Sequence, residues 1–351
     1  MKTFIKLLIF FALGIGLFNK NIYASEKIKI GLIVPLSGEN SLIGEKIIKS
    51  TRMAINKIND DRIEIIPKDT KSNPIDALKV SKELYKEGVK IIIGPVFNEC
   101  TKYLDDLEGI TFLSFTNKLI DNPKNVISAG VNAISQLKTI KKFTEKNNLS
   151  NSIFLVPRSQ FKKEIEEAIY KTKIKYKEVF YYDREPTKLT KQIEDLTKYQ
   201  IRKNNLKNEI KRLENLSFKD KEKKIQNLKK RDTLGNISFD SVIIADFDEN
   251  LKSVATSLLY TDVSSKRIFY ITLNQWFDES LLQENSLHPI YFPSINKSNY
   301  EQFMNNFKNT YGLDGDQLSF LSYDLVGLVY FLIYENDFQI SKKIFYKKNK
   351  F

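Results

Sequence analysis

Short apolar runs alternate along the chain with longer segments whose apolar residues repeat at helical spacing. Lys27–Val34 is an apolar run that predicts a strand. The segment after it carries apolar residues on one helical face, at Ile43, Ile47, Ala54, Ile55 and Ile58. Val89–Ile93, rich in β-branched residues, predicts a buried strand. Strands that alternate with helices of this length form parallel sheets with helices on both faces, so the pattern predicts an α/β fold.

The alternation continues through most of the remaining sequence. Further strands are predicted at Ile63–Ile66, Ile110–Leu113, Ser152–Val156, Glu178–Tyr182, Ser241–Ile244 and Arg267–Thr272. Helices are predicted from Asn73-Pro74 to Gly88, in a short segment ending at Leu107, and at Lys162–Lys171, Leu251–Tyr260, Tyr300–Tyr311 and Gln317–Tyr334. These units are too many for one small sheet and too irregular for an eightfold barrel. We therefore predict two doubly wound parallel-sheet lobes.

The predicted lobes exchange segments of chain at two crossings, near Gly130–Leu137 and near His288–Ser294. Lobe 1 then comprises residues 25–135 and 292–335, and lobe 2 comprises residues 136–291. Ligands of doubly wound sheets bind beyond the carboxyl ends of the strands, so we expect the ligand in a cleft between the lobes. Residues 336–351 form a basic and aromatic tail.

Residues 1–24 have the pattern of a signal peptide. Lys2 and Lys6 give a positive start, Leu7–Phe18 is apolar, and Ala24-Ser25 offers a cleavage site. The apolar run is short for a membrane span, and an uncleaved anchor is the alternative. No later run reaches the roughly 18 apolar residues of a membrane helix. We therefore expect a periplasmic protein that does not span the membrane once mature.

The excess positive charge is confined to one segment. The formal net charge is +13, and residues 198–231 alone hold 13 Lys/Arg and 4 Asp/Glu. The rest of the mature chain is nearly neutral, which, with secretion, argues against nucleic acid as a partner. Helical spacing from about 189 to 234, broken near Asn215–Lys219, predicts a charged helical hairpin inserted in lobe 2. Two interpretations stay open: a solvated hairpin, or an arm that docks on an acidic protein or an anionic surface.

The composition excludes several classes of chemistry. Cys100 is the only cysteine and His288 the only histidine, so no intrachain disulfide, thiolate cluster or paired-imidazole metal site can form. No phosphate-binding glycine loop occurs. Cys100, near a predicted helix start, would have a lowered pKa, but no base accompanies it. We expect no catalytic residue, no cofactor and no metal, and therefore no enzyme.

Five segments of the first half carry a family resemblance. They are Ile33–Gly38, Ala54–Asn59, Asp69 with Asn73-Pro74, Val89–Pro95 and Phe112–Asn117. In order and spacing they resemble the first lobe of leucine-binding-type periplasmic binding proteins, and Ser322-Tyr323-Asp324 resembles that family's late first-lobe helix. The resemblance implies the type I periplasmic binding protein fold, in which two lobes close on a small ligand.

The middle of the chain resembles a second group. Thr197–Tyr199, Leu228–Gly235 and Phe239-Asp240 are similar to an insertion of alphaproteobacterial penicillin-binding protein activators, which share the leucine-binding fold. This resemblance implies regulation of peptidoglycan synthesis by protein–protein contact. The family pattern continues past Phe351, so the sequence belongs to a short lineage or is truncated in its tail.

The resemblance to transport proteins implies ligand-binding residues at strand ends. Those proteins hold an amino acid's carboxylate with hydroxyl and backbone N–H groups after the third and fourth strands. Carried over, and extended to other strand ends, the set is Ser37, Asn98, Thr101, Ser114, Phe115, Thr116, Gln275 and Trp276. Trp276 is expected either to stack on a ligand or to pack between the lobes. Asp246 and Asp248, at a strand end, are expected either to cap a helix or to hold a cation or an ammonium group.

Two functions follow from these observations. The first is an extracytoplasmic solute-binding protein that binds an amino-acid-like or peptide-like ligand and delivers it to an ABC transporter permease. The alternative is a non-transport penicillin-binding protein activator that contacts a cell-wall synthase.

Overall fold

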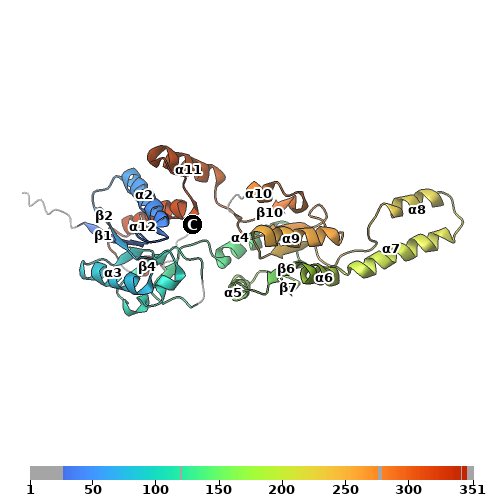
Figure 1. The fold of residues 1–351 in the computed structure, drawn as a ribbon, viewed down its shortest axis with the longest axis horizontal. Helices are drawn as coiled ribbons and strands as arrows, with labels where there is room; N and C mark the ends of the chain where they lie inside the picture. Colours follow the sequence, from blue (N-terminus) through green and yellow to red (C-terminus); the bar gives the residue numbers. More distant parts are fainter. Residues whose placement is uncertain (1–26, 119–120, 276–278, 341, 346–351) are drawn as a thin grey trace, which may run out of the picture. The chain divides into compact units, whose positions relative to one another are not determined.

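The computed structural model describes residues 27–118, 121–275, 279–340 and 342–345. The predicted signal peptide and Trp276 lie outside the described residues. The chain divides into two compact units (Figure 1). Unit 1 comprises the residues up to 115, residues 123–127 and those from 318 on, and unit 2 comprises residues 116–122 and 128–317. The predicted lobe boundaries at 135 and 292, and the cleft, stay predictions.

Unit 1 is built on a five-stranded sheet with the order β2-β1-β3-β4-β5. The strands are β1 (Ile28–Val34), β2 (Ile63–Asp69), β3 (Ile91–Ile93), β4 (Thr111–Ser114) and β5 (Val126–Ser128). β1 pairs in parallel with β2 and β3, and β3 pairs in parallel with β4. This is one of the two common doubly wound orders, in which the chain reverses its direction of travel across the sheet between β1 and β3.

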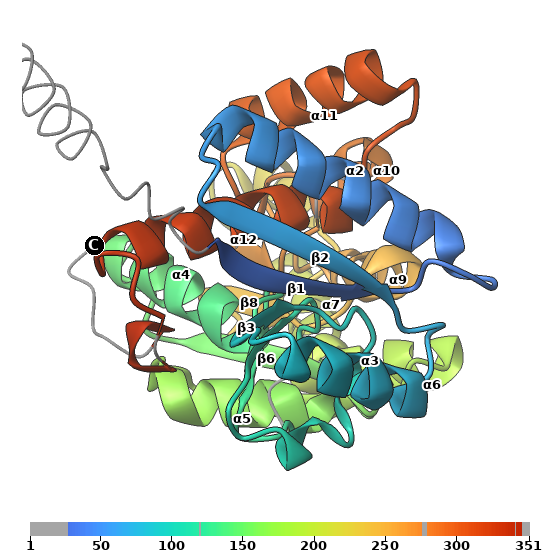
Figure 2. The ribbon, with the colours of Figure 1, turned by 90° about the vertical axis from the view of Figure 1, so that its left-hand side faces the viewer.

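Helices cover the two faces of this sheet (Figure 2). They are α2 (Ser41–Ile58), α3 (Pro74–Lys86) and α12 (Gln317–Tyr334), with the short turns η1 (Asn98–Thr101), η2 (Leu104–Asp106) and η4 (Lys342–Phe345). α3 begins as predicted, with the Asn73 side chain accepting hydrogen bonds from the N–H groups of Ile75 and Asp76. Leu84 of α3 packs on Ile33 and Ile92 of the sheet. The predicted short helix ending at Leu107 is two separate 3₁₀ turns.

α12 corrects one expectation of the sequence analysis. It has the length and apolar composition of a membrane span, which the sequence analysis did not expect after the signal peptide. Within unit 1, however, α12 is tied to α2 by polar contacts: Ser50 Oγ donates to the Ser319 carbonyl, and Thr51 Oγ1 lies 3.0 Å from Ser322 Oγ. Tyr330 Oη donates to Asp60 Oδ2 at 3.0 Å. These contacts are those of a core helix.

Unit 2 repeats the same plan. Its sheet has the order β10-β9-β8-β6-β7, with every adjacent pair parallel. The strands are β6 (Ser152–Pro157), β7 (Glu178–Tyr182), β8 (Ser241–Ile244), β9 (Phe269–Thr272) and β10 (Ile290–Tyr291). Numbered from β6, this order is again 2-1-3-4-5, so the reversal falls between β6 and β8. The two predicted parallel-sheet lobes are thereby confirmed.

Alternate residues of the unit 2 strands bury themselves on opposite faces. The helices are α4 (Ala133–Lys146), α5 (Lys162–Thr172), α6 (Pro186–Thr197), α7 (Tyr199–Glu214), α8 (Lys221–Lys229), α9 (Asp248–Tyr260), α10 (Glu279–Leu282) and α11 (Lys297–Tyr311), with η3 (Asn285–Leu287). Phe154 and Val156 pack with α4 and α5, whereas Ile153 and Leu155 pack with α6 and α9. α4 occupies a stretch in which the sequence analysis expected only a crossing.

The charged insertion begins later than the sequence predicts. Leu189 and Ile193 of α6 lie in the unit 2 core, so α6 is one of the helices that cover the sheet. The helical path breaks at Lys198, which has left-handed backbone angles, and α7 and α8 follow as the hairpin. Their break at 215–220 agrees with the predicted one. Apolar residues recur at helical spacing in α6 and in the hairpin alike. This spacing therefore does not show where the chain stops packing on the sheet.

Gly44 allows the close approach of α2 to the end of β1. A Cβ atom at this position would lie 1.8 Å from the Pro35 carbonyl oxygen. We predict that Gly44→Ala destabilises the chain by about 1–3 kcal/mol, because the backbone must move to remove the overlap. The matched change in the same unit is Gly327→Ala, where nothing lies within 4 Å of the new Cβ atom. The higher helix propensity of alanine should increase the free energy of unfolding there by at most about 1 kcal/mol. Urea unfolding measures both, and equal effects would contradict the prediction.

Candidate functional site

The carboxyl edge of each sheet contains one point where the strand order reverses. Helices leaving the two strands at such a point go to opposite faces of the sheet, so the loops separate and leave room for a ligand. In unit 1 this switch point lies between the ends of β1 and β3, and in unit 2 between the ends of β6 and β8. The residues just after these four strands are therefore the first candidates for a binding site.

Ser37, after β1, is exposed and belongs to a hydrogen-bonded turn. Its Oγ donates to Asp69 Oδ2 at 2.5 Å, and the N–H groups of Leu36 and Lys71 each donate to Asp69 Oδ1 at 2.8 Å. Burial alone would raise the pKa of Asp69, but the bond from Ser37 and these backbone bonds hold the pKa below its ordinary value. The Asp69 carboxylate thus orders the loop in which Ser37 lies.

The loop after β3 is fixed by its own backbone and by Ser114 and Phe115. Gly94 has a φ of +109°, and a Cβ there would lie 2.2 Å from the Ile33 carbonyl oxygen. The Pro95 carbonyl accepts hydrogen bonds from Ser114 Oγ at 2.9 Å and from the Phe115 N–H at 3.1 Å. Ser114 and Phe115 are both buried. Each therefore positions this loop, and their predicted contact with a ligand stays a prediction.

The other predicted residues in unit 1, and Thr116 just after it, differ in how much hydrogen-bonding capacity their side chains have left. Thr101 is buried, and its Oγ1 donates to the Asn98 carbonyl at 2.7 Å. Thr116 is buried as well, and its Oγ1 accepts from the Lys118 N–H at 3.2 Å. Asn98, at the start of η1, has a buried Oδ1 with no hydrogen-bond partner among the described residues. Of this group, Asn98 therefore has the clearest unused hydrogen-bonding capacity.

In unit 2, Asp246 is the centre of a polar network at the end of β8. Its side chain is buried, and Arg184 binds both carboxylate oxygens, with Nη2 at 2.8 Å and Nε at 3.1 Å. Tyr182 Oη donates to Oδ2 at 2.7 Å, and the Phe247 N–H donates to Oδ1 at 3.0 Å. Burial, and then the adjacent Asp246 carboxylate, raise the pKa of Tyr182 strongly, which keeps its hydroxyl a donor.

This network corrects the expectation for Asp246. Both oxygens already accept two hydrogen bonds each, which fills the capacity of a carboxylate. The residue that precedes α9 as its N-cap is Phe247, without a side-chain capping bond. Asp246 is thus neither a helix cap nor an open ligand for a cation, but the group that holds Arg184 at the carboxyl edge.

Three further residues of unit 2 lie at the same edge. Arg158, directly after β6, is about half exposed, donates to the Tyr181 carbonyl at 2.9 Å and lies 3.5 Å from Asp183 Oδ2. Ser159 has a buried Oγ with no hydrogen-bond partner among the described residues. Gln275, after β9, is buried and donates to the Leu273 carbonyl at 3.0 Å. Trp276, which follows it, lies outside the described residues.

The two switch points share one property. Each has a buried polar side-chain atom without a hydrogen-bond partner in the described part of the chain, Asn98 Oδ1 after β3 and Ser159 Oγ after β6. Native proteins leave few such atoms, since each one costs about 1–3 kcal/mol. Two further such atoms among the described residues, Asn122 Oδ1 and Asn125 Oδ1, lie between β4 and β5. At the switch points, an added ligand group would complete the hydrogen bonding of Asn98 and Ser159.

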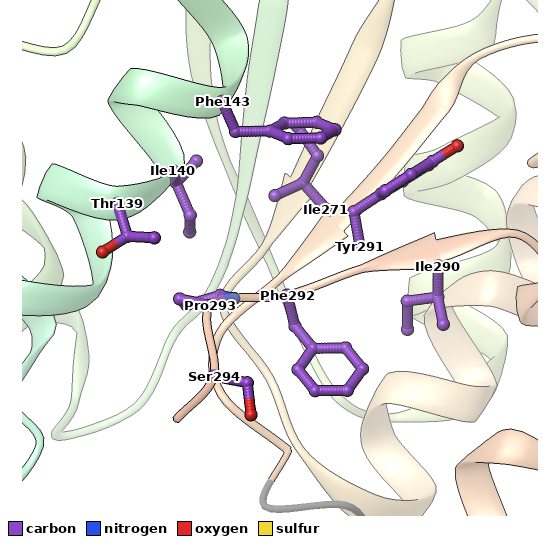
Figure 3. Close-up of a pocket in the computed structure, with 9 residues that line it drawn as sticks. All are labelled: Thr139, Ile140, Phe143, Ile271, Ile290, Tyr291, Phe292, Pro293 and Ser294. Carbon is purple, nitrogen blue, oxygen red and sulfur yellow. The ribbon is translucent and has the colours of Figure 1, made fainter. Parts of the chain in front are cut away.

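An apolar cavity of about 360 Å³ lies elsewhere in unit 2, between α4 and the β10 edge of the sheet. α4 contributes Thr139, Ile140 and Phe143, and the segment 290–294 lines the other side (Figure 3). The rings of Phe143 and Tyr291 are 5.0 Å apart. None of the residues that line this cavity carries a charge. It could hold an apolar group but not the paired charges of an amino acid.

Three members of the unit 2 site were not predicted from the sequence. Tyr182 was predicted only as the last residue of a strand, and Arg184 and Ser159 were not proposed as binding residues. A signal for Ser159 existed, because it directly follows a predicted strand. For Tyr182 and Arg184 none did, since the Asp246 that binds them is more than sixty residues further along the chain.

Cys100 differs from the sequence-based expectation of a lowered pKa. Burial in the protein, and then the nearby Glu99 carboxylate, raise the pKa of its thiol to about 11. η1 is a single 3₁₀ turn, so no long helix dipole offsets this effect. The thiol is therefore protonated near neutral pH, which disfavours a nucleophilic role.

We predict that Cys100 in the folded chain does not react with an alkylating reagent at pH 8, whereas the urea-unfolded chain reacts at one thiol. Because the folded pKa lies above the ordinary value of 9.0, the thiol's contribution to stability is complete below pH 9 and lost as the pH rises toward 11. Mass spectrometry after timed alkylation measures the reaction. Fast labelling of folded chain at pH 8 would show an accessible thiolate instead.

Comparison with known proteins supports this architecture. A family model described as periplasmic binding protein matches residues 27–191. This match includes the five segments in which the resemblance to leucine-binding-type proteins was found. Comparison with curated proteins by sequence found no match.

Solved structures similar to this chain share its fold at low sequence identity. A putative branched-chain amino acid ABC transporter protein from Rhodospirillum rubrum has a TM-score of 0.61 at 12% identity, over 87% of this chain and 84% of that one. The C-domain of LpoA (YraM) from Haemophilus influenzae, a regulator of PBP1A, has a TM-score of 0.58 at 13% identity, over 89% and 90%. A branched chain amino acid ABC transporter periplasmic ligand-binding protein from Burkholderia xenovorans has a TM-score of 0.57 at 10% identity, over 93% and 83%.

The predicted resemblance is therefore confirmed by two independent comparisons. Residues 27–191 match the periplasmic binding protein family, and the chain has the type I periplasmic binding protein fold of the leucine-binding type.

Proposed function

We propose that the chain is an extracytoplasmic solute-binding protein that binds a small amino-acid-like or peptide-like ligand through its switch-point residues. It is a binding protein rather than an enzyme, and it would deliver its ligand to an ABC transporter permease from the periplasm. The observation that carries the proposal is the unpartnered, buried Asn98 Oδ1 and Ser159 Oγ, one at each switch point.

The charged groups of unit 2 indicate which ligand chemistry this edge favours. The side chains of Arg158 and Arg184 are 52% and 41% exposed, at the ends of β6 and β7. Guanidinium groups bind carboxylates through two parallel hydrogen bonds. Asp246 holds Arg184 rigidly, so little further ordering is needed when a ligand binds. A ligand with a free carboxylate therefore fits better than a cation or a neutral sugar.

Ser159→Ala tests this proposal, with Ser152→Ala on the same strand segment as its matched control. Ser152 Oγ is buried and lies 2.7 Å from Ser241 Oγ, so its loss should destabilise the free chain by about 1–3 kcal/mol. Ser159 Oγ has no such bond to lose, so Ser159→Ala should leave the free chain as stable as before. It should nevertheless weaken ligand binding about 3- to 10-fold, the value of one hydrogen bond.

A thermal-shift screen with the amino acids, short peptides and muropeptides measures both effects. A ligand at 100 times its Kd should add about 2.7 kcal/mol of stability to the unsubstituted chain. Arg158→Gln should reduce this shift, and Arg231→Gln, which removes the same charge from the distant insertion, should not. No stabilisation by any of these compounds would count against solute binding, and a destabilised Ser159→Ala chain would show that its hydroxyl has a structural partner.

We also propose, as a second candidate function, a penicillin-binding protein activator that contacts a cell-wall synthase. The specific observation in its favour is the insertion of α7 and α8, which is similar in sequence to that of the activators. The C-domain of LpoA, a regulator of PBP1A, shows that this fold also occurs in such a regulator. Transport alone gives no reason for a basic hairpin on one lobe.

The second function predicts that the purified chain binds a purified bifunctional peptidoglycan synthase and raises its rate of glycan polymerisation. Surface plasmon resonance and a polymerisation assay measure the two effects. The matched control is Ser159→Ala, which alters the ligand site and should keep synthase binding unchanged. Saturable binding is expected without added amino acid, and absence of both binding and stimulation would contradict this function.

A further inference from the structure

The insertion is held on unit 2 by a buried arginine. We call residues 198–235 the arm; it consists of α7, α8 and the segment that returns to the sheet (Figure 1). The Arg202 side chain is buried and donates to the Thr197 carbonyl at 2.9 Å, to Thr233 Oγ1 at 2.9 Å and to the Thr261 carbonyl. One side chain thus joins the outgoing helix, the returning segment and the end of α9.

Further contacts at the base of the arm support the same geometry. The Leu234 N–H donates to the Arg202 carbonyl at 3.0 Å, and Thr233 Oγ1 donates to Asp262 Oδ2 at 2.5 Å. The rings of Tyr199 and Tyr260 are 5.4 Å apart. These contacts span both chain segments of the base, so the first turns of α7 have a fixed position on unit 2. A surface at this base is preorganised for a partner.

A groove of about 820 Å³ runs along α7 at this base. Tyr199, Leu206 and Ile210 give it an apolar part, and Arg231 contributes from the returning segment. Lys203, Lys207 and Lys211 line it from α7 at intervals of four residues, which places them on one face of the helix. The carboxylates among its lining residues are Glu214 and Asp232.

The spacing of the lysines is unfavourable for the unbound helix. Like charges four residues apart repel on a helix surface, and both the 203/207 and 207/211 pairs have this spacing. In the described part of the chain, none of the three forms a salt bridge, whereas Lys49 and Lys171 each pair with a glutamate four residues earlier. The arm therefore presents three ammonium groups on one face, beside an apolar floor.

We propose that this groove binds an acidic segment of a partner protein, with an apolar side chain against the half-buried Ile210 and carboxylates on the lysine face. Charge complementarity selects the acidic character, and the arm's 13 Lys/Arg against 5 Asp/Glu would also speed the encounter. A concave groove with an apolar floor suits a polypeptide with projecting side chains. A flat anionic bilayer would contact the outer faces of the arm instead.

This inference goes beyond solute binding and does not depend on it. Under the second candidate function, the groove would be the surface that contacts the synthase. That part of the inference rests on the proposed contact with a synthase. The groove lies on the arm, whereas the ligand residues lie at the carboxyl edge of the sheets, so variants of one site leave the other intact.

The test uses the full chain and a fluorescein-labelled acidic peptide, with Glu and Leu at helical spacing and about the length of the 16-residue helix α7. Fluorescence anisotropy at about 150 mM salt measures its affinity. The triple variant K203Q/K207Q/K211Q should weaken binding by about tenfold or more. The matched variant K223Q/K229Q/K230Q removes the same charge from exposed positions outside the groove, and it should change affinity less than about threefold.

Circular dichroism and thermal unfolding establish that both variants fold, and the groove variant should be no less stable because it removes like-charge repulsion. A Lys-and-Leu peptide of the same design should not bind. Equal losses for the two triple variants, or no binding of the acidic peptide, would overturn the proposal. Binding to phosphatidylglycerol vesicles that falls equally in both variants, with no peptide binding, would instead identify a membrane surface. Solute binding measured by thermal shift should be unchanged in every variant. Failure of the solute-binding function can therefore be distinguished from failure of the groove to bind the peptide.

Discussion

Parallel strand pairing is the constraint on which the rest of this structure depends. Parallel strands must be joined by crossovers, and because the strands point the same way, their carboxyl ends lie at the same edge of the sheet. Both sheets reverse their direction of winding after the first two strands, between β1 and β3 and between β6 and β8. The loops at these points diverge, so the backbone there must be irregular. Gly94, with its φ of +109°, and the Asp69 turn are local solutions to that requirement.

The polar side chains at the two switch points fall into two kinds. Asp246 has all its acceptor capacity filled by Arg184, Tyr182 and a backbone N–H, and therefore acts as scaffold. Asn98 Oδ1 and Ser159 Oγ are buried and unused within the described residues. A buried polar atom without a partner costs stability in the free protein, which a ligand can recover. This difference separates residues that shape the site from residues that would recognise a ligand.

The basic residues of the arm also fall into a structural kind and an exposed kind. Arg202 belongs to the most basic segment of the sequence, yet it is buried and bonded to Thr197, Thr233 and Thr261, so its charge serves the attachment of the arm. Lys203, Lys207 and Lys211, which follow it on α7, stay exposed and form no salt bridge in the described residues. A fixed base with a free basic face is suited to contact with another molecule. Solvation alone would not require so many bonds at the base.

Local sequence patterns predict the fold class and most of the strands and helices, although they missed α4. β-branched runs such as Ile91–Ile93, the Asn73-Pro74 helix start and the break between α7 and α8 depend on neighbouring residues, so local patterns predict them. Family motifs in residues 33–117 added the resemblance to leucine-binding-type periplasmic binding proteins. The folded chain alone reveals that α6 belongs to the core, that Cys100 is buried, and that Arg184 and Tyr182 bind Asp246. Such outcomes depend on which distant segments pack together, and hydrogen bonds between residues sixty positions apart leave no mark in the spacing of either segment.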